Sequence, residues 1–353
     1  MIEDQSKITN QFMQNNSKRI KLKIVCLLIF PAILLLQQFG CSKPEWLSQD
    51  LKLFGTTVRI QVQHEKRTVR ELAIKKVIKE FKRIEAKFNP YIDSSELSFI
   101  NSNAFESRVP LSDEAFELIQ FSLWASQKTQ GSFDITYAST GSLYDFRKKT
   151  KPTKKELEKA YLAIGYENIH IDDDKSIRLK HPDTKISFGG FAKGYAVKQA
   201  IEIIKGYGIE NALVTAGGDS MVIGLKKEKP WRTGIKAPRG NLRAVYTFNL
   251  SNKAISTSGD YERYFFDEND DRVHHIVNPT TGSSARKVQS VTVIGNDPML
   301  TDALSTAMFV LGAKNAIVLA ESLEGIEALI IDKSGDFHKS TGFPQHHTFL
   351  PNR

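Results

Sequence analysis

The sequence predicts an α+β domain that follows an N-terminal targeting segment. Helical and strand-like patterns succeed one another without a repeating βαβ order, which favours α+β over a doubly wound fold. No linker divides the body cleanly, so residues 51–353 are expected to form one domain. Both cysteines, Cys26 and Cys41, lie in the N-terminal segment, so the body can hold neither a disulfide framework nor a thiolate metal site.

The first 41 residues are typical of a secretory signal. Residues 18–23 are basic, residues 24–36 are almost entirely apolar, and a glycine precedes Cys41. An apolar run of this length is too short to span a bilayer, which needs about 20 residues. The glycine and cysteine resemble a bacterial lipobox, in which the cysteine is lipidated. We predict a signal segment at 1–41, a short tether at 42–50 and a membrane-anchored lipoprotein facing the extracytoplasmic (periplasmic) side. An uncleaved anchor and simple secretion are the alternatives.

The body begins with one strand pattern and two helix patterns. Alternation around Val58 and Ile60 predicts a strand at 51–63, and helical spacing of apolar residues predicts a helix at 65–88. Ser112 before two acidic residues predicts the start of a helix that ends near Gln127. Further predicted elements are a helix at 153–164, a hairpin at 168–179, a helix at 192–207, a strand at 212–216, strands and loops at 231–294, helices at 301–311 and 313–322, and a strand at 328–332.

The net charge of +9 limits the partners that can be expected. A basic surplus suits a polyanionic ligand or an anionic membrane surface, although it is also common on soluble domains. The basic residues are scattered, and the sequence has no helix-turn-helix or zinc-finger pattern. Nucleic acid is therefore not an expected partner.

Two glycine-rich turns are candidates for close approach of a ligand to the backbone. Residues 187–194 (SFGGFAKG) join a predicted strand to a predicted helix, whose N-terminus attracts phosphate. Lys193 adds a positive charge there. The second turn, at residues 216–219 (AGGD), ends a predicted strand. The spacing is not that of a Walker loop, and tight turns that serve only packing are the alternative.

Asp302 and Thr306 are a candidate pair of metal ligands. They lie four residues apart near a predicted helix start, so their side chains share a face. A carboxylate and a hydroxyl near phosphates suit Mg²⁺, which prefers oxygen ligands. A helix cap and an internally bonded hydroxyl are the alternative.

His274 and His275 end a predicted strand before a turn that contains proline and glycine. Alternation along a strand sends their side chains to opposite faces, which makes them poor joint metal ligands. One of them could act as an acid or base in a cleft, with a structural role as the alternative. In the loop at 88–97, Tyr91 could stack on a flat ring or anchor its loop.

Taken together and in order, these segments resemble the ApbE family of FAD:protein FMN transferases. The resemblance covers about residues 54–311, and its markers are FGTTVRIQV, NPYIDSSELSFIN, GSFDIT, SFGGFAKGYAV, VTAGGD, AISTSGDYERYF, HHIVNPTTG and SVTVIGNDPMLTDALSTAMFVLG. It implies a T-fold-like α+β architecture, Mg²⁺ as cofactor and FAD as substrate. It also implies transfer of FMN to a Thr or Ser hydroxyl of a partner protein, with release of AMP. The implied partners are acceptor subunits of membrane redox complexes.

The resemblance also assigns roles to single residues. It implies that Asp302, Thr306 and the Gly190 carbonyl bind Mg²⁺, and that His275 and Asp302 are catalytic. The implied flavin contacts are Phe54, Tyr91, Ser132, Phe133, Asp134, Ser187, Lys193 and Ile276. Ser187 stands where the family usually has aspartate, a lost carboxylate for which Asp219 could compensate. An FAD pyrophosphatase that forms FMN and AMP, and a flavin-binding lipoprotein without catalysis, are the alternative functions.

Overall fold

The computed structural model describes residues 45–240 and 244–346. The chain divides into two units, residues 1–45 and 46–353, and the described fold is that of the second unit together with Glu45. The predicted signal segment and Cys41 lie outside the described residues. Among the residues described, no helix is both long enough and apolar enough to cross a membrane.

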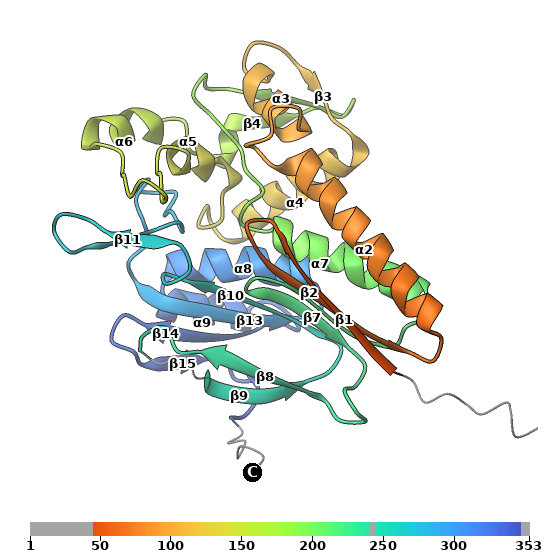
Figure 1. Ribbon diagram of the computed structural model, residues 1–353. Coiled ribbons are helices and arrows are strands. Elements are labelled where there is room, and N and C mark those ends of the chain that lie inside the picture. Colours follow the sequence, from red (N-terminus) through yellow and green to blue (C-terminus); the bar gives the residue numbers. More distant parts are fainter. Residues whose placement is uncertain (1–44, 241–243, 347–353) are drawn as a thin grey trace, which may run out of the picture. The chain divides into compact units, whose positions relative to one another are not determined.

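An eight-stranded sheet forms the centre of the fold (Figure 1). Its strands in spatial order are β1 (Glu45–Leu53), β2 (Thr56–His64), β6 (Asn211–Ala216), β7 (Asp219–Ile223), β10 (Lys253–Gly259), β13 (Val288–Gly295), β14 (Glu327–Asp332) and β15 (Phe337–Lys339). Neighbouring strands from β2 to β15 pair antiparallel. In β2 the pattern predicted by alternation is present: Val58 and Ile60 are fully buried, and Arg59 between them is exposed.

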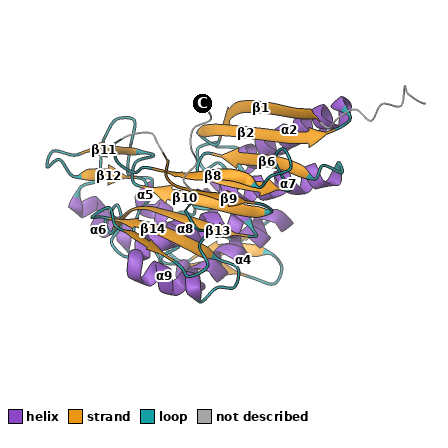
Figure 2. Cartoon of the chain, turned by 90° about the horizontal axis from the view of Figure 1, so that it is seen from below, coloured by secondary structure: helices purple, strands orange, loops and turns teal. Residues whose placement is uncertain are grey.

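Helices cover one face of this sheet, and a hairpin covers the other. The helices are α2 (Arg67–Phe88), α7 (Ala192–Gly206) and α8 (Pro298–Leu311), with α9 (Ala313–Glu321) packed beside β14. The hairpin of β8 (Trp231–Lys236) and β9 (Ala244–Leu250) lies in front of the main sheet in Figure 2. Its Trp231 and Phe248 pack with Leu329 in a separate apolar cluster. The hairpin therefore buries the part of the second face formed by β7, β10, β13 and β14.

The remaining elements are shorter. They are α3 (Glu96–Asn103), β3 (Val109–Pro110), α4 (Asp113–Lys128), the 3₁₀ helix Ile135–Tyr137, α5 (Ala138–Gly141), α6 (Lys154–Tyr161), the 3₁₀ helix Tyr166–Asn168, β4 (Ile169–Ile171), β5 (Ser176–Leu179), β11 (Tyr264–Phe266) and β12 (Arg272–His274). Local capping explains two of these helices. The Ser112 hydroxyl accepts a hydrogen bond from the amide of Ala115 at the start of α4, and Thr153 forms a capping box with Glu156 at α6.

The α+β prediction is confirmed, and so are the predicted helices at 65–88 and 192–207 within one or two residues. The predicted strand at 51–63 is wrong as a single strand. Phe54 and Gly55 adopt positive φ values of 54° and 66°, so the chain turns back there and forms two strands. The predicted tether at 42–50 overlaps with β1, which begins at Glu45. Strand β1 has no fully buried residue, and only its end, with the partly buried Leu51 and Leu53, fell within the predicted strand.

Candidate functional site

Three charged side chains, the buried Asp219 and Asp302 and the half-buried Lys193, meet where β7, α7 and α8 come together. The ammonium Nζ of Lys193, in the first turn of α7, lies 3.1 Å from Asp219 Oδ2 and 3.6 Å from Asp302 Oδ2. Asp302 Oδ2 also accepts a hydrogen bond of 2.9 Å from the amide of Gly194. Asp219 is 2% exposed and Asp302 3% exposed. The fold therefore joins the glycine-rich segment at 187–194, the turn at 216–219 and the Asp302 helix in one site.

The charges in this cluster balance only when one carboxyl group is protonated or a second cation is bound. Burial disfavours the Lys193 ammonium, but the two carboxylates outweigh that effect and hold its pKa above the ordinary value. Burial and the nearby Asp219 carboxylate raise the pKa of Asp302. With both carboxylates ionised, the single ammonium leaves a net negative charge, and the raised pKa of Asp302 reflects the cost of burying that charge. A second cation would supply the missing compensation.

Thr306, one turn after Asp302 on α8, and Gly190, in the loop before α7, come from the same elements as this cluster. Gly190 lies next to Thr306, because a Cβ built on Gly190 would make an ordinary van der Waals contact with Thr306 Cγ2 at 3.8 Å. The Thr306 hydroxyl is 3.4 Å from that of Ser258, which bonds to Ser305 at 2.8 Å. Within residues 45–240 and 244–346, no three His, Cys, Asp or Glu side chains cluster as a metal site. A site built from Asp302, a hydroxyl and a backbone carbonyl fits Mg²⁺, which keeps several ligands from water or substrate.

Ser187 and Asp219 contact different partners in the site. The Ser187 hydroxyl accepts from the amide of Gly189 at 3.2 Å and bonds to the phenol of Tyr137, so its partners are local and uncharged. Asp219, not Ser187, contacts Lys193. The carboxylate beside Lys193 therefore comes from Asp219, on a strand that follows position 187 by 32 residues in the chain. Tyr137 is a site residue that the sequence did not indicate, because an isolated tyrosine after a turn carries no pattern.

The segment at 131–137 packs against the glycine-rich loop at 187–194 through Phe133. Phe133 is buried, and its ring is 6.2 Å from that of Phe191 and close to Gly190. Asp134 Oδ1 accepts from the amide of Thr136 at 2.8 Å and from its hydroxyl at 2.6 Å. Ser132 is half-buried in the turn. Phe133 thus faces Gly190, whereas Asp134 also holds its own turn together.

Asp134 should make stability depend on pH. Burial raises the pKa of this carboxyl to about 6, against about 3.9 in an unfolded chain. Between these values the folded state binds more protons, so the free energy of unfolding decreases as pH rises. From about pH 4.5 to pH 7 we expect a decrease of roughly 2 kcal/mol from this group. Urea unfolding of the wild type and of Asp134→Asn at both pH values measures it; equal pH dependence in the two proteins would contradict the assignment.

The two histidines lie in different surroundings. His274 is buried, and its Nε2 bonds to the carbonyl of Ala285 at 2.6 Å. His275 is half-buried, its amide donates to the Arg263 carbonyl, and its Nδ1 is buried without a hydrogen-bond partner among the described residues. Burial lowers the pKa of His275 to about 3, so its imidazole is neutral near pH 7. Ile276 packs into an apolar cluster with Phe309.

Phe54 and Tyr91 both lie in loops, Phe54 between β1 and β2 and Tyr91 between α2 and α3. Phe54 lies in the turn of the first hairpin, where its amide donates to Glu85 at 2.7 Å and its ring meets that of Phe81 edge-on. The neighbouring Gly55 carbonyl accepts from the Arg263 guanidinium at 3.4 Å, which connects this turn to the segment that bonds His275. The Tyr91 side chain is 85% exposed, so its ring is free to stack on a ligand.

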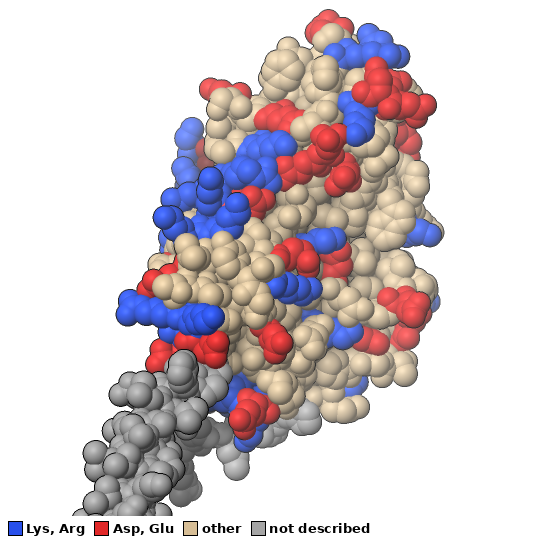
Figure 3. Space-filling view, turned by 90° about the vertical axis from the view of Figure 1, so that its right-hand side faces the viewer, with Lys and Arg blue, Asp and Glu red and all other residues tan. Residues whose placement is uncertain are grey.

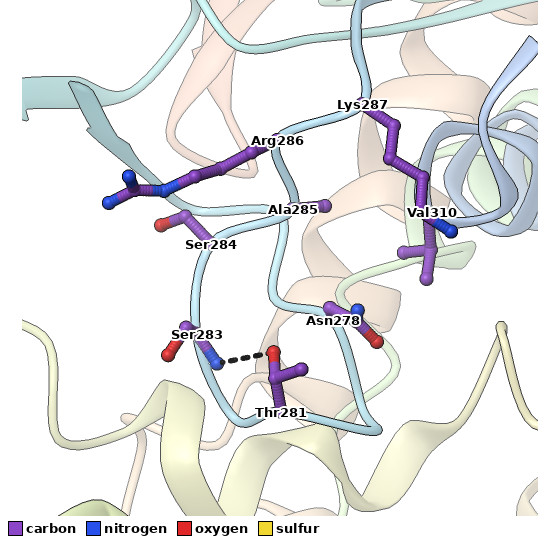
Figure 4. A pocket seen from close by; sticks show the side chains of 8 residues that line it. All are labelled: Asn278, Thr281, Ser283, Ser284, Ala285, Arg286, Lys287 and Val310. Atoms are coloured by element: carbon purple, nitrogen blue, oxygen red, sulfur yellow. Dashed lines mark hydrogen bonds between the residues drawn. The ribbon is translucent and has the colours of Figure 1, made fainter. Parts of the chain in front are cut away.

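A cavity of about 400 Å³ lies on the loop that follows His275 (Figure 4). Its lining residues are Asn278, Thr281, Ser283, Ser284, Ala285, Arg286, Lys287 and Val310. None of the residues predicted to bind flavin or metal is among them, so this cavity is not the predicted flavin site.

Comparison with known proteins agrees with this geometry. The model of the ApbE family matches residues 54–330. A relative from Vibrio cholerae named FAD:protein FMN transferase is 28% identical over 320 residues, which cover 88% of this chain and 95% of the relative. Another of that name, from Haemophilus influenzae, is 29% identical over 268 residues, covering 72% and 77%.

Solved structures show the same fold. The crystal structure of the ApbE protein from Thermotoga maritima has a TM-score of 0.79 and 34% identity, with 85% of this chain and 98% of that chain covered. The flavin transferase ApbE from Vibrio cholerae has a TM-score of 0.76 and 26% identity, with the same coverage. From the family match over most of the chain and the shared fold, we conclude that this chain is a member of the ApbE family.

Proposed function

We propose that this protein is a Mg²⁺-dependent FAD:protein FMN transferase that moves FMN from FAD to a Thr or Ser hydroxyl of a partner protein and releases AMP. The observation that carries the proposal is the Lys193–Asp219–Asp302 cluster, with both carboxylates buried, beside the N-terminus of α7. Family membership and the names of the relatives support the same activity.

The proposed reaction is a substitution at phosphorus. The acceptor hydroxyl oxygen bonds to the FMN-side phosphorus, the bond from that phosphorus to the bridging oxygen breaks, and AMP departs with the bridging oxygen. Lys193 and the amides at the start of α7 stabilise negative charge on the phosphates. Mg²⁺ held by Asp302, Thr306 and the Gly190 carbonyl would neutralise charge on the phosphate oxygens.

His275 is the candidate base for the acceptor hydroxyl proton. Because its imidazole is neutral near pH 7, it has a nitrogen lone pair for the proton, although its lowered pKa makes it a weak base there. We expect His275→Gln to lower kcat about a hundredfold. Since the group is already neutral well below pH 5, the acidic limb of the pH–rate profile should stay in place in the variant.

The check is kcat measured across the pH range for the wild type, His275→Gln and a control, His170→Gln. His170 is exposed and pairs with Asp172 away from the site residues, so its replacement should leave kcat unchanged within about twofold. Unchanged kcat in His275→Gln would remove this residue from the proton transfer.

One incubation separates the proposed activity from the two alternatives. The purified protein is mixed with FAD, Mg²⁺ and proteins from membranes of a strain that lacks this gene. Covalent FMN on an acceptor, seen as in-gel flavin fluorescence and as a mass increase on a Thr or Ser, together with free AMP, supports transfer. Free FMN plus AMP without labelled protein would show hydrolysis, and unchanged FAD would show a binding protein.

We also propose that Cys41 is lipidated and anchors the protein on the extracytoplasmic (periplasmic) side of a membrane, where its acceptors are subunits of membrane redox complexes. The order of charged, apolar and small residues before Cys41 supports this location. Metabolic labelling with a fatty acid tests it. The wild type should carry the label, and Cys41→Ser should not.

A further inference from the structure

The outward face of α2 carries lysines that have no ionic partner among the described residues. The helix contains eight basic and three acidic residues. The acids are already engaged, Glu71 with Arg67, Glu80 with Arg83 and Glu85 with the amide of Phe54. The exposed lysines left over are Lys75, Lys76, Lys79 and Lys82, and we call them the α2 lysine stripe.

The stripe is continuous along the helix. Lys75, Lys79 and Lys82 are separated by four and then three residues, so their side chains are neighbours on the surface. They extend over about 10 Å of helix at 1.5 Å per residue. Leu72 lies on the same side and is 52% exposed. Figure 3 looks onto the side of the fold that holds α2, and Lys and Arg side chains gather on the upper left of that face. Neighbouring like charges weaken a helix, and an anionic partner would relieve that repulsion.

The start of α2 lies near the point where the N-terminal segment joins the fold. Arg59 pairs with Asp50, and Gln61 bonds to Ser48, so β1 and β2 run side by side in opposite directions. This register places Glu45 near the end of β2, three residues before α2 begins. Cys41 precedes Glu45 by four residues, a chain length that spans at most about 14 Å when extended.

We propose that the α2 lysine stripe docks on the anionic lipid headgroups of the membrane to which the protein is tethered. Each lysine close to such a surface adds attraction, and the effect decays within a Debye length. The inference rests on the proposed lipidation of Cys41 and is independent of the transfer chemistry. Because α2 ends at Phe88, three residues before Tyr91, docking along α2 places that end of the candidate site near the bilayer.

A second basic segment provides the comparison within the same molecule. Lys148, Lys149, Lys154 and Lys155 are exposed lysines around α5 and α6. Lys148 and Lys154 face carboxylates, Asp145 at 3.7 Å and Glu158 at 3.8 Å, so this segment is partly compensated. In Figure 1, α6 lies on the opposite side of the fold from α2. If positive charge were sufficient, both the α2 lysine stripe and the lysines around α6 would bind an anionic membrane. If the tether at Cys41 orients the protein, only the α2 lysine stripe should bind.

The test measures lysine acylation in the full-length, lipidated protein reconstituted into vesicles. One set is phosphatidylcholine alone, and the other contains roughly one third phosphatidylglycerol. A water-soluble acylating reagent is added, and the rate at each lysine is read by mass spectrometry. In anionic vesicles we expect the rates at the stripe to fall at least about fivefold and to recover in roughly 0.5 M salt. The rates at Lys148, Lys149, Lys154 and Lys155 should change less than about twofold.

Two charge-reversed variants sharpen the result. In Lys75→Glu/Lys79→Glu/Lys82→Glu, the remaining Lys76 should lose its protection in anionic vesicles. In the matched control Lys148→Glu/Lys149→Glu/Lys154→Glu, Lys76 should keep it. Equal stripe rates in both vesicle types, equal protection of both segments, or a wild-type protein that does not float with either vesicle would overturn the proposal. None of these measurements depends on FMN transfer. A protein that lacks transferase activity would therefore give the same acylation rates and flotation as an active one.

Discussion

Replacing Asp302 with asparagine should lower kcat/KM for FMN transfer about a thousandfold or more. Asparagine has nearly the same size and keeps an oxygen that can accept the hydrogen bond from the Gly194 amide. The change therefore removes charge and leaves the shape of the site almost intact. It takes away the carboxylate that fits Mg²⁺ best among the described donors, and it leaves Lys193 with Asp219 alone. Steady-state transfer assays over a range of Mg²⁺ concentrations measure the loss.

Asp297→Asn is the matched control on the same helix. Asp297 is the N-cap of α8, where asparagine caps as well as aspartate, and its other partner is Lys198 of α7 at 2.5 Å. Its removal should change kcat/KM by no more than about twofold. If Asp302→Asn keeps wild-type activity at all Mg²⁺ concentrations, the metal assignment is wrong. If Asp302→Asn and Asp297→Asn lose activity to the same extent, the loss comes from removing negative charge anywhere on α8 and not from removing a metal ligand.

Gly194→Ala should destabilise the fold by about 3 kcal/mol and abolish FMN transfer. A Cβ at position 194 would lie 2.1 Å from the carbonyl oxygen of Pro298 and 2.8 Å from Asp302 Cβ. Backbone cannot yield as a flexible side chain does, so α7 and α8 must separate. That movement pulls the Gly194 amide away from Asp302 and carries Lys193 with it. Urea unfolding measures the stability change, and the transfer assay measures the activity.

The same helix offers the control. Gly206, at the last position of α7, has no heavy atom within 4 Å of a built Cβ. Because alanine is the better helix former, Gly206→Ala should leave stability unchanged or raise it by up to about 1 kcal/mol. Wild-type stability in Gly194→Ala would show that the two helices can separate without cost, contrary to their close packing at Gly194 and Pro298.

Local patterns were sufficient for much of the secondary structure. Ser112 and Thr153 cap the helices that follow them, and apolar spacing marked α2 and α7 within two residues. The pattern failed where an element buries little. Strand β1 has no fully buried residue, and the eight-residue helix α3 buries only Leu97 and Ile100, so the apolar signal in both is short. The turn at Phe54 was also missed, because a phenylalanine with positive φ has no turn signature of its own.

The sequence by itself determined the family, through the order of its motifs, and the residue types available to the site. It identified Lys193, Asp302 and Thr306 as candidates from spacing and resemblance. Only the tertiary structure decided that Asp219 is the partner of Lys193 and that Ser187 bonds to Tyr137 instead. The physical reason is distance along the chain. Positions 193, 219 and 302 meet because antiparallel β7 and β10 bring the start of α7 against α8, and no local pattern encodes a contact made by three separate elements.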